Sequence, residues 1–203
     1  MWDYTDTVKE FYTAPENAGI IKDADVVAEV GSIICGDALK LYLKINENDV
    51  ITQAKFQVFG CGSAIASSSA LTELIIGKKI DEAAKVTNQD IVERLGGLPN
   101  EKMHCSVMGK EAIDKALSIW KGVPIAEDDD TEGVIICQCF SVTDTLIRKV
   151  IRQNKLSDLN EVTNYTKAAG ACGSCIHKIQ DIIDQELAAR RLAESMNLDM
   201  SKL

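Results

Sequence analysis

The stretch Leu39-Lys-Leu-Tyr-Leu-Lys-Ile45, with Asn46-Glu-Asn-Asp49 behind it, decides the fold class of the first part of this 203-residue chain. Apolar side chains alternate with mostly polar ones over residues 39–45, which predicts a strand with one buried face. Residues 46–49 have the composition of a turn, and a second alternating run at 54–58 predicts the returning strand. With a further strand-like run at 26–30, the pattern predicts a three-stranded antiparallel sheet.

Helical patterns flank these strands. A short apolar face over residues 8–12 predicts an opening helix, a stripe from Ile65 to Ile75 predicts a second, and one from Ala112 to Trp120 predicts a third that ends at Gly122. Strands followed by helices favour an α+β fold in which helices cover one face of the sheet. We therefore expect an N-terminal three-stranded antiparallel sheet packed with helices.

The composition is that of a folded protein with an acidic first part. Hydrophobic residues make up 46% of the chain and charged residues 26%, so disorder is not expected. No apolar run is long enough to cross a bilayer, and the polar N-terminus lacks the pattern of a secretory signal. We therefore expect a cytoplasmic protein with no membrane partner. Residues 1–132 carry 13 basic and 23 acidic side chains, a balance that disfavours nucleic acid and favours a positively charged protein partner.

A second, smaller domain follows an acidic segment. Residues 122–133 combine glycine, proline and a run of acidic residues, which is typical of an exposed linker. The segment behind it is short and poor in large apolar residues, and domains below about 70 residues usually need a stabilising element such as a metal. We expect a domain at 1–125, a linker at 126–132, a mainly helical domain at 133–190 and a tail at 191–203.

Four of the seven cysteines form two close pairs in this second domain. Cys137 and Cys139 are separated by one residue, and Cys172 and Cys175 by two. In a reducing cytoplasm, metal binding or redox chemistry is favoured over structural disulfides. Each thiolate pair can hold one iron, and two pairs complete the four-thiolate shell of a [2Fe–2S] cluster. Such a closed shell predicts a permanent cofactor.

Three other interpretations of these cysteines stay open. Zinc accepts four thiolates, although the single-residue gap between Cys137 and Cys139 disfavours a structural zinc site. Cys172 and Cys175 resemble a dithiol redox motif, but the strand that precedes such a motif in thioredoxin-like units is missing. Inert buried cysteines are the third interpretation, which two close pairs in so short a segment disfavour.

The other three cysteines are far apart in sequence, so only folding can bring them together. Cys35 precedes the strand at 39–45, Cys61 lies where the third strand passes into a helix, and Cys105 precedes Ser106, the expected N-cap of the third helix. The positive end of a helix dipole lowers the pKa of a thiol and favours metal binding. These positions predict a metal centre in the first domain.

Two neighbouring side chains can complete this ligand set. Asp37 is close enough to Cys35 to serve as an oxygen ligand, and His104 adjoins Cys105. Three thiolates with a carboxylate or an imidazole bind soft iron less firmly than four thiolates do, which suits a cluster that must leave. The alternative stays open that these cysteines are simply buried and that the histidine is structural.

These motifs resemble those of NifU-type iron–sulfur cluster scaffold proteins. Residues 133–190 look like the bacterioferritin-associated-ferredoxin type of [2Fe–2S] domain, through the two cysteine pairs. Residues 1–125 look like the IscU-type scaffold domain, through Cys35-Gly-Asp37, Gly60-Cys-Gly-Ser-Ala-Ile-Ala66 and Lys102-Met-His-Cys-Ser-Val107. The likeness covers nearly the whole chain except its tail.

The resemblance implies a scaffold that is not an enzyme. It implies that Cys35, Cys61 and Cys105 receive iron, and sulfur from a cysteine desulfurase. It further implies that Asp37 helps to make a transient [2Fe–2S] or [4Fe–4S] cluster transferable to apo-proteins. The second domain would keep a permanent, redox-active [2Fe–2S] cluster, the scaffold domain would form a homodimer, and its empty site could accept zinc. Nitrogenase and general iron–sulfur proteins both stay open as targets.

Two features depart from the family pattern. Asn100 stands within Leu98-Pro-Asn-Glu-Lys102 where the chaperone-recognition motif of IscU proteins usually has a second proline, so a chaperone partner stays open. The C-terminal Nfu-like domain is not found, as expected of a two-domain form or a truncated chain. The alternative function is an electron-transfer or redox-sensing protein whose first domain only docks, and a zinc-binding interaction protein is a third hypothesis.

Overall fold

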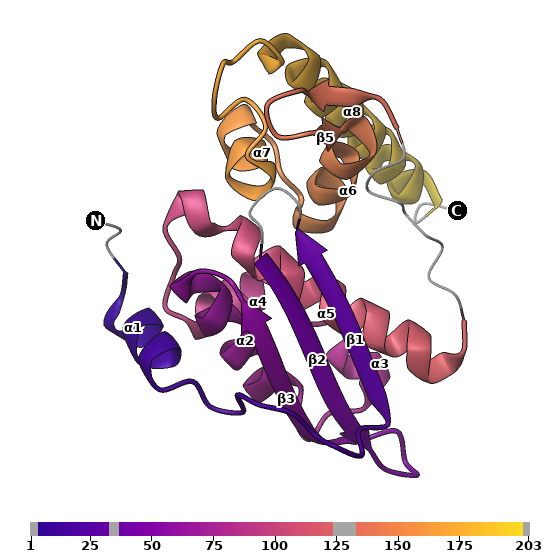
Figure 1. The fold of residues 1–203 in the computed structure, drawn as a ribbon. Coiled ribbons are helices and arrows are strands. Elements are labelled where there is room, and N and C mark those ends of the chain that lie inside the picture. The colour runs from indigo at the N-terminus through magenta and orange to yellow at the C-terminus, as the bar shows by residue number, and fades with distance from the viewer. Residues whose placement is uncertain (1–3, 33–36, 124–132, 201–203) are drawn as a thin grey trace. The chain divides into compact units, whose positions relative to one another are not determined.

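The chain divides into two compact units, Met1–Glu127 and Asp128–Leu203. The computed structural model describes residues 4–32, 37–123 and 133–200 (Figure 1). Each unit has its own buried apolar core. Within the described ranges, no helix is both long and apolar enough to cross a membrane.

The first unit is built on the three-stranded antiparallel sheet that the sequence predicts. Its strands are β1 (Val26–Ser32), β2 (Asp37–Ile45) and β3 (Ile51–Phe59), paired in the order β1-β2-β3. Ala38 lies opposite Phe59 in the pairing of β2 with β3. The beginning of β2 and the end of β3 therefore lie side by side at one end of the sheet.

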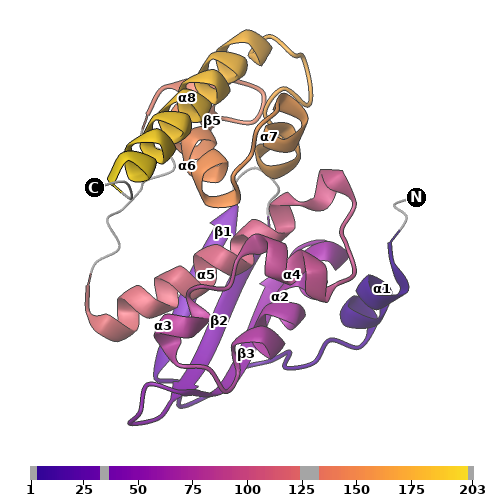
Figure 2. The same ribbon diagram turned by 180° about the vertical axis from the view of Figure 1, so that it is seen from behind.

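Helices cover one face of this sheet, so the predicted α+β class is confirmed. α5 packs against β1 and β2, and α2 packs against β3 and α5, so both helices stand in front of the sheet in Figure 2. Leu39, Leu41 and Leu43 of β2 are at most 1% exposed and form the centre of the core. The helical elements of the unit are α1 (Asp6–Thr13), α2 (Gly62–Ile75), α3 (Ile80–Ala83), α4 (Asn88–Arg94), the 3-10 helix η1 (Asn100–Lys102) and α5 (His104–Lys121).

Helix α2 is buried on more sides than its apolar stripe predicts. Ser63, Ser67 and the adjacent Ser68 and Ser69 are at most 2% exposed, because α1, α4, α5 and β3 all pack against this helix. Small side chains allow such close packing, and the hydroxyls can bond to nearby backbone. The Ser68 hydroxyl, for example, donates to the Ala64 carbonyl at 2.8 Å.

The expected N-cap of the third predicted helix is wrong. α5 begins at His104, with Met103 as its N-cap, and η1 leads directly into it. Ser106 therefore lies inside the first turn, where its hydroxyl donates to the Met103 carbonyl at 2.8 Å. The shift places Cys105, the second residue of α5, within the first turn of the helix.

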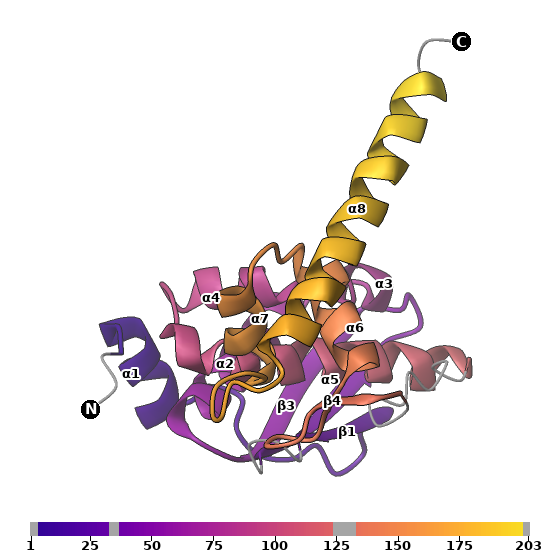
Figure 3. The same cartoon turned by 90° about the horizontal axis from the view of Figure 1, so that it is seen from above.

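The second unit is mainly helical, as predicted. β4 and β5 form a two-stranded antiparallel sheet, and α6 and α7 pack against each other and against α8. Figure 3 shows α8 as one long helix that continues past α6 and α7, so the expected tail at 191–203 begins inside a helix. The elements are β4 (Ile135–Cys137), β5 (Val142–Thr143), α6 (Asp144–Asn154), α7 (Leu159–Thr166) and α8 (Ile176–Met200).

A buried carboxylate fastens α6 to α8. Glu186 of α8 is 7% exposed. Its Oε1 accepts from Arg148 Nη1 at 2.9 Å, and its Oε2 accepts from Arg152 Nε at 2.7 Å. The Arg152 guanidinium holds the pKa of Glu186 below its usual range. These charge-assisted bonds fix the helix that follows Cys175.

Candidate metal centres

Three potential ligands converge at one end of the first unit. Asp37 is the first residue of β2, Cys61 is the N-cap of α2 directly after β3, and Cys105 lies in the first turn of α5. The pairing of β2 with β3 brings Asp37 beside the residues that follow Phe59. The carboxylate oxygen and the two sulfurs lie within 4.8 Å of one another, which is close enough for all three to bind one metal centre.

The carboxylate of Asp37 is buried within this group. Asp37 is 7% exposed, and its Oδ2 atom has no hydrogen-bond partner among the described residues. A buried polar atom without a partner is energetically costly, and a bound cation can satisfy it. The donor set is therefore one that a cation would complete.

The two thiols of this group are electrostatically coupled. Cys61 Sγ lies 3.6 Å from Cys105 Sγ. The hydrogen bond from the Cys105 thiol lowers the pKa of Cys61 to about 5, with smaller contributions from the backbone N–H of Ala64 and the positive charge of Lys102. Cys61 is then a thiolate at neutral pH, and the thiolate is the form that binds metal and acts as a nucleophile.

The sequence predicts two further ligands for this site, Cys35 and His104. Cys35 falls in the segment 33–36, outside the described residues. His104, the half-buried first residue of α5, is not among the ligand atoms that meet within 4.8 Å in the described part of the chain. Lys102, which sequence reasoning did not select, contributes positive charge to the site, and its position three residues before Cys105 was the available signal.

The second unit gathers its four thiols on neighbouring loops. Cys137 ends β4 and Cys139 lies in the turn between β4 and β5, while Cys172 and Cys175 lie between α7 and α8. Cys139 Sγ and Cys172 Sγ are 3.3 Å apart, and the thiols of Cys137 and Cys175 are also hydrogen-bonded. Both of these sulfur contacts join cysteines from different motifs.

These four thiols differ in burial. Cys137 and Cys175 are 2% and 3% exposed, whereas Cys139 and Cys172 are exposed to solvent. Burial raises the pKa of the Cys175 thiol. The hydroxyl of Ser174 lies 3.2 Å from Cys172 Sγ and, with the Ser174 backbone N–H, lowers the pKa of Cys172 to about 7. The sequence did not identify Ser174 as a functional residue. Its position between Cys172 and Cys175 was the available signal.

The donor set of the second unit fits a resident [2Fe–2S] cluster. Four thiols from two loops supply the four-thiolate shell that this cluster needs. Gly173 has φ +71°, in the left-handed region that favours glycine, and this turn brings the chain back between Cys172 and Cys175. A cluster bound here would supply one-electron transfer.

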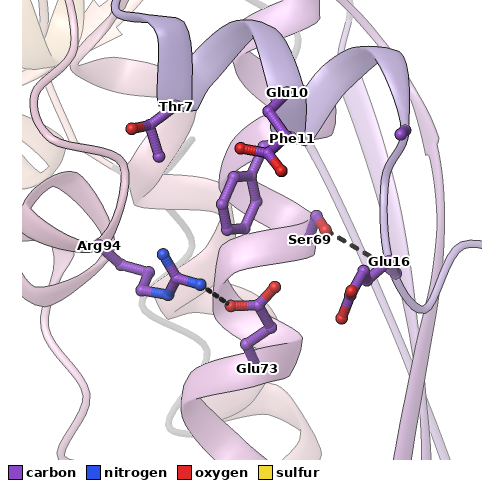
Figure 4. A pocket seen from close by; sticks show the side chains of 8 residues that line it. Thr7, Glu10, Phe11, Glu16, Ser69, Glu73 and Arg94 are labelled. Atoms are coloured by element: carbon purple, nitrogen blue, oxygen red, sulfur yellow. Dashed lines mark hydrogen bonds and ion pairs between the residues drawn. The ribbon is translucent and has the colours of Figure 1, made fainter.

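A hollow between α1, α2 and α4 carries no cysteine or histidine (Figure 4). Arg94 pairs with Glu73 and lies over the Phe11 ring at 4.8 Å, and the Ser69 hydroxyl donates to the Glu16 carbonyl. These contacts fasten α1 and α4 to α2. The hollow is lined by Thr7, Glu10, Phe11, Ala14, Glu16, Ser69, Glu73 and Arg94.

Comparisons with known proteins match both units. Residues 3–126 match the family described as "NifU-like N terminal domain", and residues 135–185 match the "BFD-like [2Fe-2S] binding domain". The chain is 50% identical to "Nitrogen fixation protein NifU" of Nostoc sp., an alignment that covers 97% of this chain and 68% of the relative. It is 53% identical to the protein of the same name from Azospirillum brasilense, over 93% of this chain and 61% of the relative.

A third relative matches a little over half of the chain. "Iron-sulfur cluster assembly scaffold protein IscU 1" of Archaeoglobus fulgidus is 46% identical, over 56% of this chain and 74% of the relative. The thiol and carboxylate group of the first unit and the four-thiol group of the second thus lie in regions that match a scaffold domain and a [2Fe–2S]-binding domain, respectively. The chain belongs to the NifU family of iron–sulfur cluster scaffold proteins.

Proposed function

We propose that the first unit assembles its transient iron–sulfur cluster on Cys35, Asp37, Cys61 and Cys105, while the second unit holds a permanent [2Fe–2S] cluster on Cys137, Cys139, Cys172 and Cys175. The observation that supports the first assignment best is the meeting of Asp37, Cys61 and Cys105 within 4.8 Å. The second assignment is supported by the two sulfur contacts that link the two cysteine motifs.

Cys61 is proposed as the acceptor of sulfur. Its low pKa makes it a thiolate at neutral pH, which can attack the outer sulfur of a persulfide on a cysteine desulfurase. A sulfur–sulfur bond forms at Cys61, the sulfur–sulfur bond of the desulfurase persulfide breaks, and the desulfurase cysteine leaves as a thiolate. A dithiol reductant then supplies the two electrons that convert each transferred sulfur into sulfide.

Asp37 is proposed to keep the product transferable. A carboxylate is a harder ligand than a thiolate and suits iron–sulfur clusters less well, so an iron bound by Asp37 is held less firmly than one bound by two thiolates. His104, beside Cys105 in the sequence, is proposed as a further donor during exchange. The same mixed set of sulfur and oxygen donors accepts zinc when the scaffold site is empty.

The proposed partners follow from this chemistry. A cysteine desulfurase supplies the sulfur and apo iron–sulfur proteins receive the cluster, while the acidic character of residues 1–132 favours partners with a basic surface. We also propose that the chain forms a homodimer and acts without catalysing a reaction of its own. Its free thiols suit a reducing compartment such as the cytoplasm.

Spectroscopy with iron and sulfide analysis tests the proposal on the full chain. The protein as isolated is expected to contain one [2Fe–2S] cluster. Incubation with a desulfurase, cysteine, a dithiol and ferrous iron should raise both iron and acid-labile sulfide, and the added cluster should pass to an apo-ferredoxin. Cys61→Ala should lose the increase and keep the original cluster. An unchanged content after incubation of the wild-type chain would contradict the scaffold role.

A further inference from the structure

Gly60 leaves room that the Asp37 side chain occupies. A Cβ atom built on Gly60 would lie 2.8 Å from both Cγ and Oδ1 of Asp37, and 3.0 Å from the Cβ of Ala64. Real Cβ atoms essentially never approach other atoms within 3.0 Å. The φ angle of Gly60 lies outside the left-handed region, so the backbone conformation does not require glycine here. The relevant property of Gly60 is that it has no side chain to clash with Asp37.

A methyl group at this position would have to displace the carboxylate. Ala64 lies in α2 and is fully buried, and the helix around it is packed on several sides, so that neighbour cannot retreat cheaply. The Asp37 carboxylate is the end of a side chain, and its Oδ2 has no hydrogen bond among the described residues to hold it. The space that Gly60 leaves therefore allows the carboxylate to lie where it does.

We propose that Gly60 is a positioning residue, which acts by letting the Asp37 carboxylate lie within binding distance of the Cys61 and Cys105 sulfurs. The inference rests on the proposed function in one respect, because Asp37 must bind the metal for its position to matter. A change of one methyl group at Gly60 then acts on the metal centre through Asp37, with no change to any ligand atom.

Gly62 provides a matched control for this substitution. It flanks Cys61 on the other side, and a Cβ on Gly62 would meet the Tyr12 ring at 3.4 Å, an ordinary van der Waals contact. Gly60→Ala and Gly62→Ala therefore add the same methyl group next to the same cysteine. Only Gly60→Ala places it against the carboxylate.

The first measurement is the affinity of the scaffold site for Zn²⁺, made on the full chain with its [2Fe–2S] cluster in place, so that only the scaffold site is open. Gly60→Ala is expected to weaken Zn²⁺ binding about tenfold, as the loss of a residue that orients a ligand usually does, and Gly62→Ala to bind as the wild type does. Asp37→Ala should weaken binding as well. The double variant Asp37→Ala/Gly60→Ala should bind no more weakly than Asp37→Ala alone.

The outcomes separate this inference from the proposed role of Asp37 in cluster release. Wild-type affinity in Gly60→Ala, or an effect of Gly60→Ala that persists in the Asp37→Ala background, would overturn the inference. A second measurement follows transfer of an assembled cluster to apo-ferredoxin, which Asp37→Ala and Gly60→Ala should slow alike. If Asp37→Ala transfers at the wild-type rate while the zinc data agree, Gly60 positions Asp37 and the release role fails.

Unfolding measurements keep the test decisive if Gly60→Ala is unstable. Removal of the Asp37 carboxyl group opens the space that the new methyl group needs. The double variant should therefore unfold at a higher temperature than Gly60→Ala. A double variant as unstable as Gly60→Ala would mean that the methyl group clashes elsewhere, and would overturn the inference.

Discussion

The two proposed metal centres of this chain are built in different ways. In the first unit, Asp37, Cys61 and Cys105 come from three distant segments and reach one point only because β2, β3, α2 and α5 pack together. In the second unit, four thiols come from two short motifs on adjoining loops, and two of them face solvent. The first centre therefore depends on the sheet and helices of its unit, and the second on two local loops.

The two proposed centres also differ in the kind of ligand that they contain. The proposed first centre includes a carboxylate, one oxygen of which has no hydrogen-bond partner among the described residues, and the proposed second centre has cysteine ligands alone. A closed set of four soft ligands suits a cluster that stays, and a mixed set suits one that leaves. Retention of the cluster by the second unit and its release from the first would then follow from the ligands of each centre.

Removal of one thiol from each centre, in separate variants, should produce the largest difference in the content of the permanent [2Fe–2S] cluster. Cys175→Ala deletes a buried, proposed ligand of the second centre, so the protein should be isolated without its [2Fe–2S] cluster. Cys61→Ala should leave that cluster at full occupancy, because the two units have separate cores. Iron and sulfide analysis with absorption spectroscopy measures both. A chain that retains its cluster after Cys175→Ala would break the comparison.

The second prediction concerns the pH dependence of thiol reactivity. Because the pKa of Cys61 is lowered to about 5 from an ordinary value of 9.0, the thiolate should dominate above pH 5 and be lost only below it. Alkylation of Cys61 should therefore reach half of its maximum rate near pH 5 and stay level from pH 7 to pH 9. An ordinary thiol of pKa 9.0 would gain roughly fiftyfold over that interval.

Iodoacetamide labelling followed by peptide mass spectrometry gives this profile for Cys61 alone. The experiment uses the chain with its [2Fe–2S] cluster bound, which protects the four thiols of the second unit. Cys105→Ala is the informative variant, since it removes the largest cause of the low pKa and should move the midpoint upward. A midpoint that does not move in this variant would show that the two sulfurs are not coupled.

The sequence predicts much of this arrangement, and its limits have physical causes. The alternation of apolar and polar residues over 39–45 is enough to predict the central strand of the sheet, because one face of β2 is buried. The meeting of Asp37 with Cys61 cannot be read from spacing, since it depends on the register that sets Ala38 opposite Phe59. The apolar stripe alone does not predict the added burial of α2, because that burial arises from tertiary contacts with α1, α4, α5 and β3. Gly60 was visible as part of a motif, but the space that it leaves for Asp37 appears only in the folded chain.

The third prediction is a difference in resistance to chelators. After a cluster has been assembled on the wild-type chain, an iron chelator should remove the iron of the scaffold site at least about tenfold faster than that of the second unit, as expected for mixed against all-thiolate ligands. Loss of absorbance over time should thus show two phases. Asp37→Cys, which replaces the carboxylate with a thiolate, should slow the fast phase and leave the slow one unchanged, and a single phase in the wild type would contradict the predicted difference.

The smallest expected effect concerns Ser174, whose hydroxyl lies 3.2 Å from Cys172 Sγ. Reduction adds negative charge to a cluster, and a hydrogen bond to a ligand sulfur stabilises the more negative state. Ser174→Ala should therefore lower the midpoint potential of the [2Fe–2S] cluster. The shift should be small, on the order of tens of millivolts at most, because Cys172 is exposed and solvent weakens the electrostatic effect of this hydrogen bond.

Two further variants make this small shift interpretable. Ser174→Thr keeps a hydroxyl and should restore the potential. Ser195→Ala removes a hydroxyl that bonds to the Leu192 carbonyl far along α8, and should leave the potential unchanged. A redox titration followed by electron paramagnetic resonance measures all four proteins. An unchanged or higher potential in Ser174→Ala would show that the solvent-facing thiolate of Cys172 is not tuned by this hydroxyl.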